Sequence, residues 1–372
     1  MISEDRLLDL DVDTPALLLD LDRLESNIES MAAFARRNGF SLRPHAKTHK
    51  SANIARLQMN AGAVGVCCAK LSEAEALAHA GIGTITITSN IIGRQKVDRL
   101  HRLHSEIADL IVVADDPTVV AALSARHPQP SHKLPVLIDL DVGLHRSGVV
   151  SSENAVALAR QIESAPGLRF AGLQAYAGHV QQIGDRQQRQ AEAAKSAAVL
   201  RATISALAEA GFPSEIVTGG GTGTYAIDPE FRIFTDLQVG SYVFMDVEYL
   251  SVDCPSASKP WFKPSLFVIS QVVSAAQGDH VTIDAGSKSL SLDGPMPWVV
   301  APRERELRYA LYGDEFGMVG PESGPVGLKL GDRVALLTPH CDPTVNLHEH
   351  YTCFRGKTIV GLWPIEARGQ ST

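Results

Sequence analysis

The sequence predicts an α/β protein in which a (β/α)8 TIM barrel is followed by a mainly β C-terminal domain. Eight short apolar and β-branched runs lie between about residues 40 and 245, and helical patterns separate them, as in repeated βα units. Eight such units in roughly 200 residues are typical of a closed barrel. From about residue 250 the apolar runs are separated by Gly, Pro and Asp turns without helical periodicity, which predicts a separate β-domain.

The eight barrel strands are predicted in chain order from these runs. They span residues 42–47, 65–69, 84–88, 110–114, 136–140, 171–175, 215–218 and 237–244. Residues 72–81 begin with a capping box and end at a glycine, which predicts a helix after the second strand. Residues 186–210, rich in Ala, Gln and Leu, predict another helix after the sixth strand.

One early apolar run, residues 15–22, precedes the first helix and would be a ninth barrel strand. A barrel of eight strands has no place for it, so we expect it to leave the barrel and join the C-terminal sheet. That sheet includes the predicted strands 266–273 and 333–337. The predicted organisation is an N-terminal strand that joins the β-domain (1–25), a barrel (26–248) and a C-terminal β-domain (249–372).

The composition of the 372 residues is that of a soluble globular protein. A formal net charge of −8 at pH 7 argues against nucleic acid or an anionic membrane as the partner, because both require a basic face. We therefore expect a small-molecule partner. The five cysteines fit neither a disulfide framework nor a CxxC zinc site, and no signal or transmembrane segment follows the acidic N-terminus. These features predict a cytoplasmic protein.

The most informative segment is the heptad Pro-His-Ala-Lys-Thr-His-Lys at residues 44–50, which follows the start of the first predicted strand. Lys47 lies at its centre, among two histidines and a second lysine. Like charges and desolvation both lower the pKa of a lysine, and a partly neutral lysine can form a Schiff base. The alternative is a basic surface loop without chemistry.

Phosphate often binds to a barrel at the loops that follow strands seven and eight. After the seventh predicted strand comes a glycine-rich segment that includes Gly220, Gly221 and Thr222. Glycines allow a close approach of the backbone, whose N–H groups can bind a phosphate together with Thr hydroxyls. Ser241 and Tyr242, at the eighth strand, can add donors. A single glycine-rich turn can also be a plain loop, but its position here favours a phosphate site.

Three further side chains follow the fifth and sixth predicted strands. Arg146 carries a permanent charge that suits a phenolate or carboxylate, although it can instead neutralise Asp139 or Asp141. Tyr176 follows the sixth strand and is either a functional phenol or a core aromatic. His179 lies beyond a glycine at the same strand end, where catalytic residues are common, and this favours a catalytic role.

Near the C-terminus, His340 and Asp342 are separated by Cys341. If this segment is extended, the His340 and Asp342 side chains lie on one face and the Cys341 side chain lies on the other. Nitrogen and hard oxygen donors suit Mn, Zn, Co or Mg, with water at the open positions. The alternative is a histidine that is simply paired with a nearby aspartate.

Four segments with candidate site residues follow one another along the chain, at residues 43–50, 141–148, 218–222 and 339–346. In combination they resemble the D-threonine aldolase and D-serine dehydratase family, which belongs to the alanine-racemase-like, fold-type III pyridoxal phosphate enzymes. The likeness extends in the same order from about residue 14 to residue 364. It implies a barrel plus β-domain, usually as a homodimer, which holds pyridoxal 5'-phosphate as a Schiff base. It also implies a divalent metal, with manganese favoured over Mg, Co or Zn.

Position by position, the resemblance implies Lys47 as the Schiff-base lysine, Tyr176 as the partner of the pyridine nitrogen and Arg146 near the phenolic oxygen. The implied metal ligands are His340 and Asp342. Dehydratases of the family tend to have cysteine where this chain has Asp342, which favours an aldolase. The implied phosphate contacts are Gly220, Gly221, Thr222, Ser241 and Tyr242.

These roles predict a lyase that cleaves a D-3-hydroxy amino acid, such as D-threonine, to glycine and an aldehyde. The metal would bind the β-hydroxyl, and His179 or a hydroxide on the metal would remove its proton. The nearest alternative is a dehydratase of D-serine or D-3-hydroxyaspartate, with Lys47 as the base at Cα. Two other classes stay open: a non-catalytic pyridoxal phosphate carrier, and a metal-dependent barrel hydrolase that uses His45, His49, His145 and His179.

Overall fold

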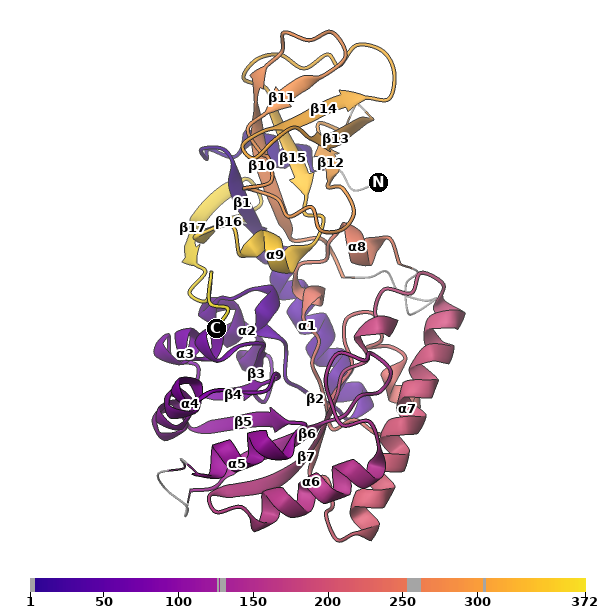
Figure 1. Cartoon of the computed structure of the whole chain (residues 1–372). Coiled ribbons are helices and arrows are strands. Elements are labelled where there is room, and N and C mark those ends of the chain that lie inside the picture. Colours follow the sequence, from indigo (N-terminus) through magenta and orange to yellow (C-terminus); the bar gives the residue numbers. More distant parts are fainter. Residues whose placement is uncertain (1–3, 126, 128–131, 253–261, 304–305) are drawn as a thin grey trace.

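The computed structural model describes residues 4–125, 127, 132–252, 262–303 and 306–372. A barrel of parallel strands and a mainly antiparallel β-domain are stacked along the long axis of the molecule (Figure 1). The eight predicted barrel strands are all present, in the order β2-β9-β8-β7-β6-β5-β4-β3. They are β2 (Ser41–Leu42), β3 (Val66–Cys68), β4 (Thr84–Ile87), β5 (Asp109–Ala114), β6 (Leu134–Asp139), β7 (Leu168–Ala175), β8 (Ile216–Gly219) and β9 (Asp236–Leu237).

The two edge strands of this sheet, β2 and β3, meet through the chain that follows β2. His45 forms a parallel bridge with Cys67. The N–H of Cys67 donates to the carbonyl of Pro44 at 2.8 Å, and the N–H of Val64 donates to that of Leu42 at 2.9 Å. The sheet therefore closes on itself, and the predicted TIM-like barrel is confirmed.

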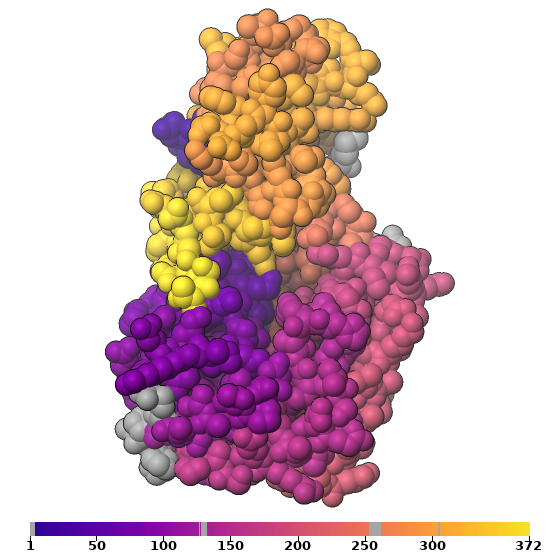
Figure 2. All heavy atoms as spheres, in the orientation of Figure 1, coloured from indigo at the N-terminus to yellow at the C-terminus, as the bar shows by residue number. Residues whose placement is uncertain are grey.

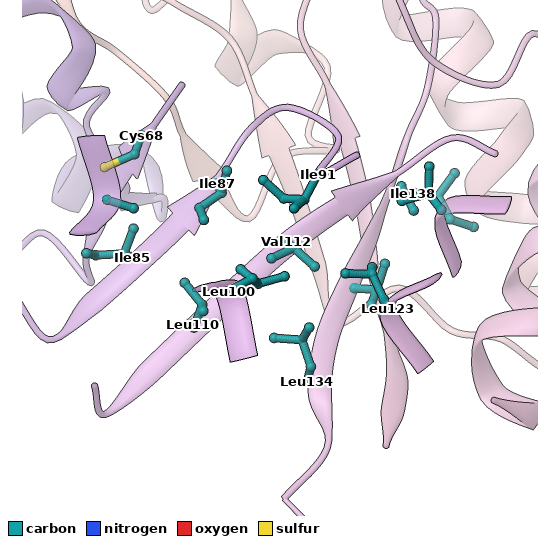
Figure 3. Packing of buried hydrophobic residues seen from close by; sticks show 14 of the residues in the cluster. Cys68, Ile85, Ile87, Ile91, Leu100, Leu110, Val112, Leu123, Leu134 and Ile138 are labelled. Carbon is teal, nitrogen blue, oxygen red and sulfur yellow. The ribbon is translucent and has the colours of Figure 1, made fainter. Parts of the chain in front are cut away.

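Helices cover the outside of the barrel. In β5, Leu110 and Val112 pack in the layer between strands and helices, whereas Ile111 and Val113 belong to a small cluster inside the barrel, as the alternation of strand side chains requires. Figure 3 shows the outer layer, in which Val112 of β5 lies among side chains of neighbouring strands and helices. The helices are α1 (Leu21–Asn38), α2 (Ala52–Asn60), α3 (Leu71–His79), α4 (Arg94–Glu106), α5 (Pro117–Ala125), α6 (Ser152–Ser164) and α7 (Arg186–Glu209). The short helix α8 (Val247–Leu250) follows the barrel and lies at its junction with the β-domain.

The second sheet has the order β11-β14-β13-β12-β15-β10-β1-β16-β17, and an additional pairing of β10 with β11 closes six of its strands into a ring. β1 lies between β10, with which it is antiparallel, and β16, with which it is parallel. The early apolar run therefore leaves the barrel and joins the C-terminal sheet, as predicted. The strands are β1 (Ala16–Asp20), β10 (Leu266–Ser274), β11 (Val281–Ile283), β12 (Trp298–Ala301), β13 (Leu307–Leu311), β14 (Gly317–Pro321), β15 (Arg333–Leu337), β16 (His350–Arg355) and β17 (Thr358–Pro364).

The barrel and the β-domain share one hydrophobic core, in which Leu24 of α1 and Tyr242 of the barrel lie in the same cluster as Leu336 and Tyr351 of the β-domain. The C-terminal segment also lies directly against the first part of the barrel (Figure 2). There the N–H of Ala367 donates to the carbonyl of Lys50 at 3.0 Å. These contacts fix the β-domain over the carboxyl ends of the strands.

The expected extended conformation around His340 is wrong, because the helix α9 (Cys341–Val345) begins directly after it. Pro343 suits this first turn, where the missing N–H leaves no helical hydrogen bond unmade, and the Asp342 carboxylate is favoured by the helix dipole. The N–H of Cys341 donates to the carboxylate of Asp246 at 3.0 Å. His340 and Asp342 therefore occupy the start of a helix rather than one face of a strand.

The first and last predicted barrel strands are shorter than expected. β2 and β9 have two residues each, and the chain continues into the 3-10 turns η2 (Ala46–Thr48) and η5 (Ser241–Val243). These turns pack closely together, since a Cβ atom on Gly240 would lie 2.7 Å from the hydroxyl of Thr48. Both turns are used at the site described below.

Within the described ranges, no helix combines the length and the apolar character that a bilayer span requires. Cys67, Cys68, Cys341 and Cys353 are buried free thiols.

Candidate active site

A cavity of about 470 Å³ lies at the carboxyl ends of the barrel strands, with Tyr249 of α8 on its wall. Residues that follow β2, β3, β4, β6, β7, β8 and β9 line it. Chemistry on a barrel collects at this end of the strands, because each strand delivers a side chain there from a rigid scaffold. The lining includes Lys47, Lys70, Ser89, Arg146, Tyr176, Thr222 and Ser241.

Lys47 is positioned by the short turn η2. The N–H of Lys47 donates to Nδ1 of His45 at 3.4 Å, and Nε2 of His45 lies 3.1 Å from the hydroxyl of Thr88. Because that hydroxyl donates its only proton to the carbonyl of Cys68 at 3.2 Å, it must accept from Nε2–H. Burial, and then the charge of Lys47, lower the pKa of His45. His45 is therefore a neutral imidazole that fixes the turn.

The side chain of Lys47 forms an ion pair with the carboxylate of Asp342 and is 41% exposed. Burial lowers the pKa of Lys47, but the charge of Asp342 and its hydrogen bond, with the nearby Tyr176, raise it, and the net shift is upward. The predicted lowering of the Lys47 pKa is therefore wrong for the protein alone. The heptad shows only the cations beside Lys47, whereas the decisive anion comes from the other end of the chain.

Asp342 belongs to the β-domain and lies against the side chain of Lys47, a residue of the cavity wall. Burial raises the pKa of its carboxyl, but the charge and hydrogen bond of Lys47, and the charge of His340, outweigh this and lower it to about 2. Its Oδ1 atom is buried and has no hydrogen-bond partner among the described residues. Asp342 is therefore an ionised carboxylate with one oxygen available.

His340 lies among further carboxylates. Its Nδ1 atom is 3.1 Å from Oδ2 of Asp293, and its Nε2 atom is 3.9 Å from Oε2 of Glu248. Burial lowers the pKa of His340, but Asp342, Asp246 and Glu248 raise it, and the net shift is upward. In the described part of the chain, Oε2 of Glu248 is buried without a hydrogen-bond partner.

These donors fit a divalent metal with an incomplete protein ligand set. The described ranges contain no ready cluster of three or more His, Cys, Asp or Glu side chains that could hold an ion. However, His340 and Asp342 offer one nitrogen and one unpaired carboxylate oxygen, and hard divalent ions complete such sets with water and substrate. Two protein ligands are too few for a closed structural zinc centre.

The loops after β8 and β9 form an anion cradle. The backbone N–H groups of Thr222, Gly240 and Ser241 donate to no described residue. Three cations, Lys47, Lys70 and Arg146, line the same cavity, and no described carboxylate does so. Free N–H groups in a cationic cavity suit a phosphate dianion. These two loops could therefore hold the phosphate group of pyridoxal phosphate, and the phosphate site stays a prediction.

Arg146 and Tyr176 also line the cavity, and the guanidinium of Arg146 lies 5.9 Å from the centre of the Tyr176 ring. Burial raises the pKa of Tyr176, so its phenol stays protonated. Both side chains therefore line one cavity, and their roles toward a cofactor stay a prediction.

Three predicted site residues lie elsewhere. The Tyr242 side chain is buried in the core, where its hydroxyl accepts from Nε2 of Gln58 at 3.1 Å, and only its backbone N–H reaches the cradle, donating to Thr222 at 3.1 Å. Gly220 (φ +67°) turns the loop rather than lining the cavity. His179 is exposed and does not line the cavity. Its ring lies against Gly143, where an added Cβ atom would be 3.1 Å from Nε2 of His179.

The four histidines of the hydrolase alternative do not gather. His45 and His49 are buried, and burial lowers the pKa of His49 to about 4. His145 is exposed and bonds through Nδ1 to the carboxylate of Asp141 at 2.8 Å. The described residues hold no metal cluster that includes them.

Sequence reasoning missed several residues of the site. Lys70 and Asn90 follow β3 and β4, so the tendency of functional residues to lie at the carboxyl ends of barrel strands predicts them too. Glu248 and Asp293 give no such signal, because each is a single acidic residue in a short helix or a turn and meets His340 only through the tertiary fold.

The chain is similar to known proteins over nearly its whole length. Residues 19–248 match the model of the alanine racemase N-terminal domain, and residues 265–354 match that of a putative serine dehydratase domain. The chain is 39% identical to a D-threonine aldolase of an Arthrobacter species, over 97% of this chain and 94% of that protein. It belongs to the D-threonine aldolase and D-serine dehydratase family.

Two further relatives of this family cover nearly the whole chain. A 3-hydroxy-D-aspartate aldolase of Paracoccus denitrificans (strain Pd 1222) is 36% identical over 97% of this chain and 93% of that protein. The crystal structure of D-threonine aldolase from Filomicrobium marinum matches with a TM-score of 0.93 and 38% identity, over 97% of both chains. The predicted family and its alanine-racemase-like fold are confirmed, and the family implies pyridoxal phosphate as cofactor.

Proposed function

We propose that this chain is a pyridoxal 5'-phosphate- and divalent-metal-dependent D-threonine aldolase, a lyase that cleaves D-3-hydroxy amino acids to glycine and an aldehyde. One observation carries the proposal: the amino group of Lys47, a residue of the cavity wall, lies against the carboxylate of Asp342 in the β-domain. A group that can hold the cofactor and a group that can hold a metal are therefore adjacent. The aldolase names of the relatives support the same reaction.

The residues that would hold the cofactor are those that converge on the cavity. Lys47 would hold its aldehyde carbon, Arg146 its phenolic oxygen and Tyr176 its pyridine nitrogen, while the loops with Gly221, Thr222 and Ser241 would hold its phosphate. Gly220 and Tyr242 would act through the backbone of those loops. When bound, pyridoxal phosphate supplies an electron sink for the bond that breaks at Cα.

His340 and Asp342 would hold the metal, for which we propose manganese, with Mg, Co or Zn as substitutes. A divalent ion there supplies a Lewis acid for the substrate's β-hydroxyl. If Lys47 held the cofactor, its nitrogen would no longer be the free ammonium that pairs with Asp342, and the Asp342 carboxylate would need another partner. An unpaired buried carboxylate is costly, so attachment of the cofactor favours a cation beside Asp342.

The proton of the β-hydroxyl needs an acceptor, and Nε2 of His179 is the proposed one. His179 lies in the turn η3 (Gly178–Val180), three residues after Tyr176 of the cavity wall, and its side chain is exposed. Imidazole is the side chain that most often serves as a general base, and an exposed one can pass its proton on to water. A His179→Gln variant that keeps full activity would remove it from this role.

A dehydratase is the second candidate, because residues 265–354 match a putative serine dehydratase domain. In that reaction Nζ of Lys47 would take the proton from Cα, and the β-hydroxyl would leave from the metal side of the cavity. The products separate the candidates, since an aldolase gives glycine and an aldehyde and a dehydratase gives an oxo acid and ammonia. A non-catalytic pyridoxal phosphate carrier would give neither pair.

The test is incubation of the cofactor-loaded protein with D-threonine, D-serine and D-3-hydroxyaspartate, with glycine, aldehyde and ammonia measured in parallel, with and without a chelator. We expect glycine and acetaldehyde from D-threonine, and loss of both with the chelator. Ammonia without glycine would replace the aldolase with the dehydratase. Activity that is indifferent to the chelator would remove the metal from the proposal.

We also propose that the protein works as a cytoplasmic homodimer, as the resemblance implies. Sedimentation analysis of the loaded protein tests the dimer, and a monomeric mass at working concentration would refute it.

A further inference from the structure

The imidazole of His340 has a different partner on each ring nitrogen. Nδ1 lies 3.1 Å from Oδ2 of Asp293, and Nε2 lies 3.9 Å from Oε2 of Glu248. The first distance is a hydrogen bond and the second is not. An ionised carboxylate can only accept, so Nδ1 must carry the proton of the bond to Asp293. The lone pair that is left for a metal is then on Nε2.

Asp293 is held in place from two directions. The hydroxyl of Ser291 donates to Oδ1 of Asp293 at 2.7 Å, so each carboxylate oxygen has one fixed partner. The N–H of Ser291 donates to the hydroxyl of Thr344 in α9 at 3.2 Å. The turn that carries Asp293 is therefore tied to the helix that begins directly after His340, although about half of the Asp293 side chain is exposed.

The Nε2 side of His340 has the features of a cation position. Nε2 faces Oε2 of Glu248, which is buried and accepts from no described residue. Two lone pairs that face one another at 3.9 Å repel, and a proton or a cation between them relieves that repulsion. In the protein alone a proton can take that place, and a divalent metal would replace it.

We propose that Asp293 is a positioning residue for the metal site: it fixes His340 in the tautomer and orientation that present Nε2 to the ion. This inference rests on the proposed role of His340 as a metal ligand. Histidines that bind metals commonly donate their other ring N–H to a carboxylate, which sets the tautomer and raises the basicity of the ligand. Loss of such a partner typically costs about 10–100-fold in metal affinity.

The test measures Mn²⁺ binding to the pyridoxal-phosphate-loaded full chain by electron paramagnetic resonance of free Mn²⁺, together with the Mn²⁺ dependence of activity. We expect Asp293→Ala to weaken Mn²⁺ binding by about 10–100-fold, while kcat at saturating Mn²⁺ falls much less. Asp293→Asn keeps an oxygen that can accept from Nδ1–H, so its affinity should lie between those of Asp293→Ala and the natural chain.

Asp279→Ala is the matched control, because Asp279 also pairs with Nδ1 of a histidine, His280, at 2.7 Å but on an exposed part of the β-domain. It should bind Mn²⁺ like the natural chain. His340→Ala separates the inference from the proposed function. If His340→Ala loses Mn²⁺ but Asp293→Ala binds it with natural affinity, the positioning role of Asp293 is overturned and the metal site stands. If His340→Ala binds Mn²⁺ with natural affinity, both are overturned.

Discussion

Gly221 is the position where one methyl group should most directly damage the proposed cofactor site. A Cβ atom there would lie 2.7 Å from Cδ of Gln181 and closer still to its Oε1. Gln181 cannot simply move away, since it is buried and fixed by hydrogen bonds. Its Oε1 accepts from the N–H of Gly223 at 2.9 Å, and its Nε2 donates to the hydroxyl of Thr224 at 3.2 Å.

Gly221→Ala should therefore displace either Gln181 or the loop. Overpacking of this kind costs about 1–3 kcal/mol, and a buried N–H left without its acceptor costs a similar amount. If about 2 kcal/mol of this appears as distortion of the cradle, the affinity for pyridoxal phosphate falls roughly 30-fold. The assay is a titration of cofactor-free protein with pyridoxal phosphate, followed by absorbance, with the unfolding temperature measured in parallel.

Gly184→Ala is the matched control, because a Cβ atom at Gly184 would meet no atom within 4 Å. It should bind pyridoxal phosphate like the natural chain. A Gly221→Ala variant that unfolds at a lower temperature but binds pyridoxal phosphate with natural affinity would refute the reasoning, since it would separate this loop from the cofactor.

Three further predictions follow from the same structure. Lys47→Ala should abolish both the lyase activity and the pyridoxyl label that borohydride reduction leaves on the protein. The control Lys288→Ala, which removes an exposed lysine paired with Glu315, should keep both. A label that survives Lys47→Ala contradicts the assignment. In cofactor-free protein Lys47 forms an ion pair with Asp342, so this form should bind Mn²⁺ at least about tenfold more weakly than loaded protein, a difference of about 1.4 kcal/mol. Equal affinities of the two forms by calorimetry would show that the ion pair does not compete with the metal. Burial raises the pKa of Asp228 to about 8, well above the roughly 3.9 of an unfolded chain. The folded state therefore binds this proton more tightly, and stability falls as the pH rises from about 4 to about 8. Asp228→Asn should remove that fall, so its free energy of unfolding should rise relative to that of the natural chain by up to about 1.4 kcal/mol per pH unit in this window. Urea unfolding at pH 5, 6, 7 and 8 measures the difference. Parallel plots of unfolding free energy against pH for the two proteins would show that the carboxyl is not the cause.

Most of the fold could be predicted because a parallel strand that is buried on both faces has a local sequence signal, a short apolar run between turns. The exceptions are β2 and β9, which end after two residues because the chain turns at once into η2 and η5. No apolar pattern marks that change, since residues 237–244 stay mostly apolar in order to fill the core that the two domains share.

The site was predictable where a strand end delivers the residue, as for Lys47 and Thr222. The strand-end rule does not give the direction of a side chain, so Tyr242 points into the core and His179 lies against Gly143. The charge state of Lys47 could not be predicted either, because its partner Asp342 is 295 positions away in the sequence. Only the docking of the β-domain brings the two together.

The place of β1 in the second sheet has a consequence for how the cell makes this protein. Leu18 lies opposite Phe267 on one side and beside Thr352 on the other, so neither neighbour exists when it leaves the ribosome. At about 5–20 residues per second, translation needs tens of seconds to supply them. During that interval an apolar, leucine-rich and aggregation-prone strand is exposed on the nascent chain. We therefore expect the yield of soluble enzyme to depend on chaperones that shield this strand.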